Sequence, residues 1–195
     1  MGKSRLEAFS DGVIAIIITI MVLEMKVPHG ESLDSLLPVV PVFLSYVLSF
    51  VYVGIYWNNH HHMLHASRKI SGAVLWANLH LLFWLSLFPF VTDWMGESHW
   101  ASLPTAGYGA VLFMAAVAYW ILQQTIIHQQ GHESILRRAV GRDLKGKLSP
   151  VLYAAGIATA FWRPVISTLI YFGAALVWLV PDRRIERVLA EQSHE

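Results

Sequence analysis

Acidic side chains are rare in the apolar parts of this sequence, and three of them lie beside its first apolar run. Glu7 and Asp11 precede the uncharged stretch 12–23, and Glu24 follows it directly. A charge at bilayer depth is costly, so such residues usually face other protein or a water-filled cavity and pair with another polar group. The first apolar segment is therefore the place where we expect a functional site.

Asp11 is expected to form a buried polar cluster with Arg5 and Ser10. An unpaired carboxylate at that depth is unfavourable, so the cluster needs a partner from another segment. We predict that this partner is one of the three histidines His60–His62 near the end of the second apolar segment, with His61 as the preferred choice and Trp57 nearby. A purely structural role, in which the cluster holds the first segment in register, is the alternative.

The first segment also carries a mostly apolar stripe with one hydroxyl group. At helical spacings of three, four and seven residues, one face collects Gly12, Ile16, Thr19, Ile20 and Leu23. Taken alone, such a stripe is more often a packing surface between helices. If several copies of the helix surrounded a pore, however, rings of Ile or Leu would form hydrophobic constrictions, and the threonine would offer oxygens to an ion.

Two pairs of histidines have the spacing of possible metal ligands. His61 and His65 lie four residues apart, as do His128 and His132, so each pair can present two nitrogens on one helix face. Neither pair has an evident third ligand, there is no HExxH, and the chain has no cysteine. We therefore predict no metal site and no other cofactor.

The elements that position these residues are membrane-spanning helices. The 195-residue chain is 55% hydrophobic and 14% charged, whereas soluble domains carry about 25% charged residues. Its apolar residues come in long blocks, which suit a lipid environment. We predict an all-α membrane protein, one domain over residues 1–195, with six spans at 6–27, 38–59, 70–91, 103–127, 149–162 and 164–180.

The fifth span is short for a bilayer, so a reentrant pair formed by the last two segments is the competing interpretation. The basic residues favour six spans, because Lys and Arg are enriched in cytoplasmic loops. With the N-terminus inside, cytoplasmic positions hold 12 of the 14 basic residues: Lys3, Arg5, Arg68, Lys69, Arg137, Arg138, Arg142, Lys145, Lys147, Arg183, Arg184 and Arg187. We therefore expect a multi-pass protein of the cell membrane with both termini cytoplasmic.

The residues 5–11, with the letters RLEAFSD, resemble the R-x-x-x-F-S-D signature of the transmembrane protein 175 family of potassium channels, in its six-helix prokaryotic form. The four specified letters of this signature correspond here to Arg5, Phe9, Ser10 and Asp11. The likeness continues in order along the chain, at Trp57-Asn58-Asn59-His60-His61-His62, Asn78, Leu85-Ser86-Leu87-Phe88-Pro89-Phe90, Ile170-Tyr171 and Pro181-Asp182-Arg183-Arg184.

The resemblance implies a homotetramer in which the first helices line a central pore. It places a hydrophobic constriction at Ile16, a pore threonine at Thr19 and a second apolar ring at Leu23, all on the stripe described above. The family lacks a backbone-carbonyl filter, and this sequence has no TVGYG-like segment. The implied function is therefore a potassium-selective or potassium-preferring channel, with potassium ions and the bilayer as partners.

Two other functional classes are less well supported by the residues. A proton-coupled transporter with Asp11 and a histidine as relay would be expected to show repeated halves and broken helices, which we do not find in the sequence. A hydrolase built on the histidines lacks the necessary motifs, among them GxSxG, HExxH and a P-loop. The net charge of +1 gives no indication of nucleic-acid binding. We predict that the protein is not an enzyme.

Overall fold

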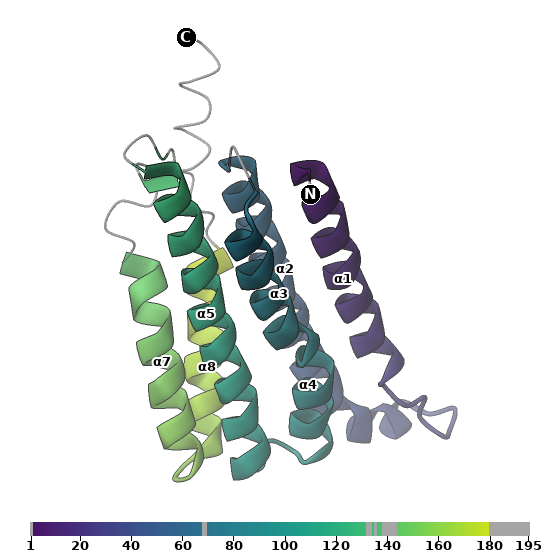
Figure 1. Cartoon of the computed structure of the whole chain (residues 1–195). Helices are drawn as coiled ribbons and strands as arrows, with labels where there is room; N and C mark the ends of the chain where they lie inside the picture. The colour runs from purple at the N-terminus through teal and green to yellow at the C-terminus, as the bar shows by residue number, and fades with distance from the viewer. Residues whose placement is uncertain (1, 68–69, 132–133, 135, 138–143, 180–195) are drawn as a thin grey trace.

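The computed structural model describes residues 2–67, 70–131, 134, 136–137 and 144–179, and within these ranges its regular elements are all helices (Figure 1). In chain order they are α1 (Lys3–Leu23), the short 3-10 helix η1 (Leu33–Val39), α2 (Val40–His65), α3 (Gly72–Ser86), α4 (Phe88–Glu97), α5 (Ser102–Gln130), α7 (Leu144–Ala160) and α8 (Pro164–Leu179). Taking α3 and α4 as one interrupted span, the prediction of six transmembrane helices is confirmed.

The third span is interrupted rather than continuous. α3 ends at Ser86, and α4 begins at Phe88 with Pro89 in its first turn. A proline there has no N–H to bond to the preceding turn, so the chain is broken and restarted at this point. Together the two pieces form a segment of 26 residues, Gly72–Glu97, that is long and apolar enough to cross a bilayer.

The last two spans are short and pack side by side along the lower part of α5 in Figure 1. α7 has 17 residues and α8 has 16, which at about 1.5 Å per residue gives roughly 25 Å each, close to the hydrocarbon thickness of about 30 Å. α7 begins at Leu144, five residues before the predicted start of the fifth segment. Both helices lie alongside α5 in Figure 1, which is the packing of two spans rather than of a shallow reentrant loop.

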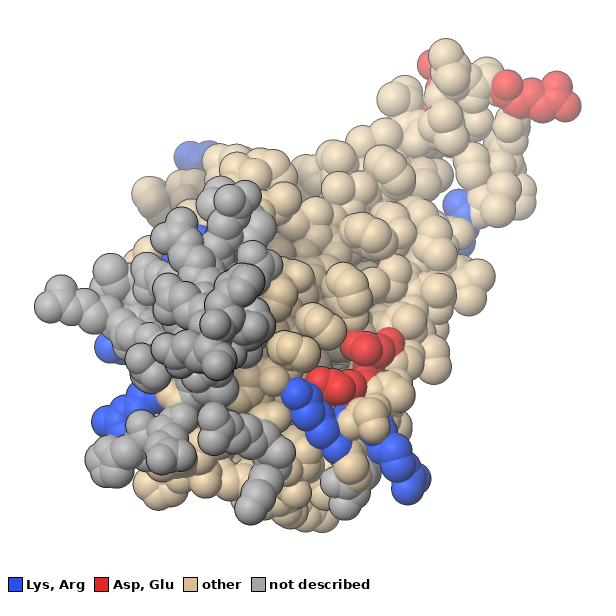
Figure 2. Space-filling model, turned by 90° about the horizontal axis from the view of Figure 1, so that it is seen from above, with Lys and Arg blue, Asp and Glu red and all other residues tan. Residues whose placement is uncertain are grey.

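The basic residues of the described helices separate between the two ends of the bundle. In Figure 1, α1 begins and α2 and α5 end at the upper end of the bundle, while α7 begins and α8 ends somewhat below it but on the same side. Figure 2 looks onto this end, where Lys and Arg side chains are visible around the face. By their positions at the ends of these elements, Lys3, Arg5, Arg137, Lys145 and Lys147 belong here, and Lys26 and Arg163 belong to the opposite end.

A tyrosine cluster fixes the second half of the bundle to α2. The Tyr52 hydroxyl donates to the carbonyl of Tyr171 at 2.5 Å, and the rings of Tyr171 and Tyr108 lie 5.8 Å apart. Glycines on α5 and α7 make room for Tyr171, since a Cβ at Gly109 or Gly156 would fall 1.9 or 2.2 Å from its side-chain atoms. α8 is therefore held between α2, α5 and α7, and α1 packs on the other side of α2 and on α3 and α4 (Figure 1).

Candidate functional site

One face of α1 is buried against the rest of the subunit. Leu6, Ser10, Ile14, Ile17 and Met21 are each at most 3% exposed, and their spacings of four, four, three and four residues define a single helical face. This face packs on α2, α3 and α4. This packing fixes the rotation of α1 about its own axis, and it therefore also fixes the direction in which the other side chains of the helix point.

The opposite face of α1 carries the predicted stripe and is exposed. Ile16 is 58% exposed, Ile20 38% and Leu23 78%, and Gly12 and Thr19 are also exposed. The described part of the subunit thus leaves a row of apolar side chains uncovered along a spanning helix. Such a surface is typical of a contact with another chain, with lipid or with a water-filled cavity.

Thr19 is the one hydroxyl on the exposed stripe. Its Oγ1 donates a hydrogen bond to the carbonyl of Ile16 at 2.9 Å, which is the usual way a threonine hydroxyl is satisfied within a helix. The oxygen keeps acceptor capacity after donating. Thr19 can therefore offer lone pairs to a cation on the exposed side, one turn from the side chain of Ile16.

A buried chain of three polar side chains anchors α1 to two other helices. Asn78 on α3 donates from Nδ2 to the Ser10 hydroxyl at 3.0 Å, and its Oδ1 accepts from Nε2 of His60 on α2 at 2.7 Å. All three residues are at most 1% exposed. Ser10 also donates to the Leu6 carbonyl of its own helix at 2.9 Å. Because each group in this chain has a partner, polar side chains are tolerated in an apolar interior.

Asp11 has a different partner from the one predicted. The indole N–H of Trp57 on α2 donates to Oδ1 of Asp11 at 3.0 Å. The structure shows no contact between Asp11 and His61 in the described subunit, where His61 is exposed and its ring stacks on that of His65 with the centres 6.1 Å apart. One residue is a rotation of about 100° on a helix, so His60 and not His61 turns toward the interior.

Two further residues of the signature, Arg5, which we predicted in the buried cluster, and Phe9, lie on the exposed side of α1. Arg5 is exposed, and Phe9 is 48% exposed. They precede Gly12 and Ile16 at spacings of four, three and four residues, so they extend the exposed stripe toward the start of α1. The signature residues therefore divide between two faces: Ser10 is buried, Asp11 pairs with Trp57, and the other two point away from the subunit.

Both ends of α1 are tied to its neighbours. At its start, the Lys3 ammonium donates to the carbonyl of His65, the last residue of α2, at 2.8 Å. Just beyond its other end, Lys26 forms an ion pair with Glu97, the last residue of α4. The hydrogen bond and the charge of Glu97 raise the pKa of Lys26. These contacts and the buried chain hold the exposed stripe in one orientation.

Two members of the site, His60 and Asn78, were not among the predicted site residues. A lone asparagine in the long apolar run of the third span is a signal that could have found Asn78, since such a side chain needs a hydrogen-bonding partner in lipid. As for metals, within the part of the chain that the structure describes no three His, Asp or Glu side chains gather as ligands. His132 of the second predicted pair lies outside the described residues.

Comparison with known proteins gives consistent matches along the whole chain. Residues 5–89 match the family model described as the endosomal/lysosomal potassium channel TMEM175. A potassium channel of Chryseobacterium sp. (strain P1-3) is 56% identical over 191 residues, covering 98% of this chain and 100% of the relative. A potassium channel of Streptomyces collinus is 32% identical, covering 63% of this chain and 66% of the relative.

More distant matches come from animals and from a solved structure. The human endosomal/lysosomal proton channel TMEM175 is 36% identical over 86 residues, which are 38% of this chain and 17% of that protein. The crystal structure of a lysosomal potassium-selective channel TMEM175 homolog from Chamaesiphon minutus superposes with a TM-score of 0.81 at 28% identity, covering 92% of this chain and 97% of that one. The helical arrangement described above is therefore shared with a channel.

Proposed function

Because this chain belongs to the TMEM175 family of ion channels, we propose that it is a potassium-selective or potassium-preferring cation channel whose pore is lined by α1. The observation that carries the proposal is the two-faced α1: one face is locked into the subunit, and the face with Ile16, Thr19 and Leu23 is left uncovered. A helix that contributes one wall of a pore shared between subunits requires this division.

The proposed assembly is a homotetramer in the cell membrane, with both chain termini cytoplasmic. The grouping of basic residues at the end where α1 begins supports this orientation. In such an assembly four Ile16 side chains form the narrowest ring, and four Leu23 side chains form a second apolar ring nearer the outer mouth. The permeating potassium ion is the only bound species that the mechanism needs.

Selectivity is proposed to follow from the order of the side chains. An ion passing the Ile16 ring sheds part of its hydration without receiving a ligand, and potassium holds its water less tightly than sodium. The ring therefore penalises sodium more. Thr19, one turn away, offers oxygens to the ion as it rehydrates. The apolar ring of Ile16 can also close the pore by dewetting.

The test is ion flux into liposomes that contain the purified protein and a potassium gradient. Uncoupled flux that follows voltage and prefers potassium to sodium is expected; flux with a fixed proton stoichiometry would favour a proton-coupled transporter using Asp11.

Ile16→Asn should raise conductance, since a polar ring stays wet, and Thr19→Val should leave the fold intact but reduce the preference for potassium. Ile18, partly buried on another side of α1, supplies the control variant Ile18→Asn. If Ile18→Asn changes permeation and Ile16→Asn does not, the wrong face has been assigned to the pore.

A further inference from the structure

A groove runs between α2 and α8 in the half of the bundle where α2 ends. It consists of two adjoining hollows, of about 240 Å³ toward the side of the bundle and about 40 Å³ deeper between α2, α5, α7 and α8. Ile55, Asn59 and Trp178 line both hollows, so the two lie next to each other. We call the pair of hollows the α2–α8 groove.

The lateral part of the α2–α8 groove is lined mostly by apolar residues, together with Asn58 and Asn59, and is opened by a glycine. Its walls include Phe50, Val51 and Gly54 of α2. A Cβ built at Gly54 would meet no atom within 4 Å. Because the protein is a multi-pass membrane protein, an apolar furrow between two spanning helices faces the hydrocarbon core of the bilayer. A lipid acyl chain is therefore expected to occupy it.

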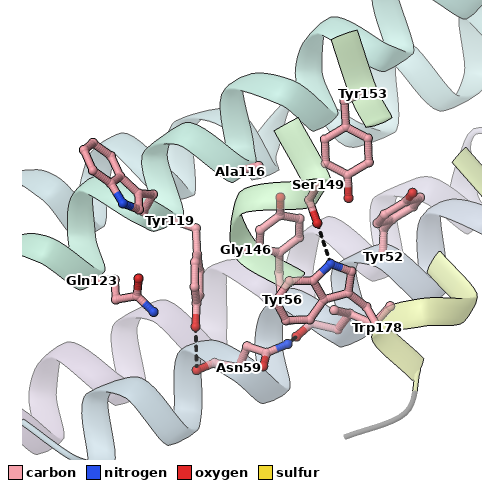
Figure 3. A pocket seen from close by; sticks show the side chains of 12 residues that line it. Tyr52, Tyr56, Asn59, Ala116, Tyr119, Gln123, Gly146, Ser149, Tyr153 and Trp178 are labelled. Carbon is pink, nitrogen blue, oxygen red and sulfur yellow. Dashed lines mark hydrogen bonds between the residues drawn. The ribbon is translucent and has the colours of Figure 1, made fainter. Parts of the chain in front are cut away.

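The deep part combines aromatic walls with polar groups (Figure 3). Trp178 donates from Nε1 to the Ser149 hydroxyl at 2.7 Å, and the Tyr119 hydroxyl donates to the Asn59 carbonyl at 3.4 Å. Tryptophan and tyrosine, each with an apolar ring and one polar atom, are typical of the level at which the bilayer meets water. This end of the groove therefore lies where a lipid headgroup would be.

Basic side chains stand at that same end. The Lys145 ammonium donates to the carbonyl of Val177 at 3.2 Å and lies 6.0 Å from the ring centre of Trp178. Lys147, two residues further on α7, is exposed. Among the residues that the structure describes, the lining of the two hollows contains no carboxylate. Basic pockets between spanning helices on the cytoplasmic side are suited to anionic lipid headgroups.

We propose that the α2–α8 groove binds one anionic phospholipid, with an acyl chain beside Gly54 and its phosphate against Lys145. None of the described residues that line the groove belongs to α1, so the site does not include the exposed stripe that is proposed to line the ion pathway. The proposal requires only that the helices lie in a bilayer, and it can fail or succeed independently of conduction.

The experiment uses the absence of native cysteine. A fluorophore on Val51→Cys, within the groove, reports quenching by lipids with brominated acyl chains in vesicles of phosphatidylcholine and phosphatidylglycerol. At equal mole fractions, brominated phosphatidylglycerol is expected to quench more strongly, reflecting an enrichment of about fivefold, the factor expected for one Lys near an anionic lipid. A fluorophore on Leu169→Cys, exposed on α8 and outside the groove lining, should show no preference.

Two further variants separate the charge from the shape of the site. Lys145→Gln should abolish the preference at position 51, whereas Lys26→Gln, at the opposite end of the bundle, should preserve it. Gly54→Leu should fill the furrow and lower quenching by both lipids, whereas Gly173→Leu, at another helical glycine with open space beside it, should leave quenching unchanged. Equal quenching by the two lipids, or a preference that survives Lys145→Gln, would overturn the proposal. So would complete protection from both lipids, which would show that a second copy of the chain covers the groove.

Discussion

Asn78 is the residue whose loss should most weaken the attachment of α1. Its amide connects Ser10 on α1 at 3.0 Å with His60 on α2 at 2.7 Å, and its side chain is fully buried. Asn78→Leu keeps a side chain of similar size and removes both hydrogen bonds. The substitution therefore tests the polar connection rather than the packing around it.

The expected cost follows from the number of bonds and their environment. Hydrogen bonds between helices in a membrane contribute about 0.6 kcal/mol on average and up to about 1.7 kcal/mol. Two such bonds give a loss of about 1–3 kcal/mol in the free energy of unfolding. Ser10 retains its bond to the Leu6 carbonyl, so more of the loss is expected from the unpaired imidazole of His60 than from the serine.

The measurement is unfolding of the purified protein in mixed detergent micelles, followed by tryptophan fluorescence. Ser86→Ala is the matched control, because the exposed Ser86 hydroxyl on the same helix bonds only to its own turn, at the carbonyl of Phe83; its effect should stay within about 0.5 kcal/mol. An Asn78→Leu protein as stable as the parent, or a Ser86→Ala protein equally destabilised, would refute the view that the buried chain anchors α1.

Three further predictions address α1 and the topology. Ile17→Ala should lower the free energy of unfolding by about 2 kcal/mol. This is the lower end for a buried large-to-small change, because lipid also solvates apolar side chains when the helices separate. Ile16→Ala should leave the free energy of unfolding nearly unchanged and alter conductance; equal destabilisation by the two variants would contradict the assignment of one buried and one exposed face to α1. Asp11→Ala should cost about 1.5–3 kcal/mol through the lost charge-assisted bond with Trp57 and change oligomer size more than ion preference, as gel filtration and flux measurements would reveal. Single cysteines in residues 128–148, which connect the fourth and fifth predicted spans and are expected to be cytoplasmic, should resist an impermeant thiol reagent added outside intact cells. Their labelling would mean that the orientation is reversed.

The sequence determined the number and type of the elements because the bilayer imposes them locally. Each uncharged block must satisfy its own backbone hydrogen bonds in lipid, so length and composition identify a helix without knowledge of its neighbours. The same local reasoning found the stripe of Ile16, Thr19 and Leu23, since positions three and four apart always share a helical face. The break at Leu87 was missed, although Pro89 is a signal for it.

Only the tertiary structure decided which polar side chains meet. The sequence shows three consecutive histidines after Trp57, and helical periodicity gives their relative angles but not the rotation of α2 about its own axis. That rotation is set by packing against α1, α4 and α8, and it turns His60 inward to Asn78 while His61 remains exposed. Periodicity fixes positions within one helix, whereas contacts between helices depend on how several helices are rotated and shifted relative to one another, which is a property of the whole packed bundle.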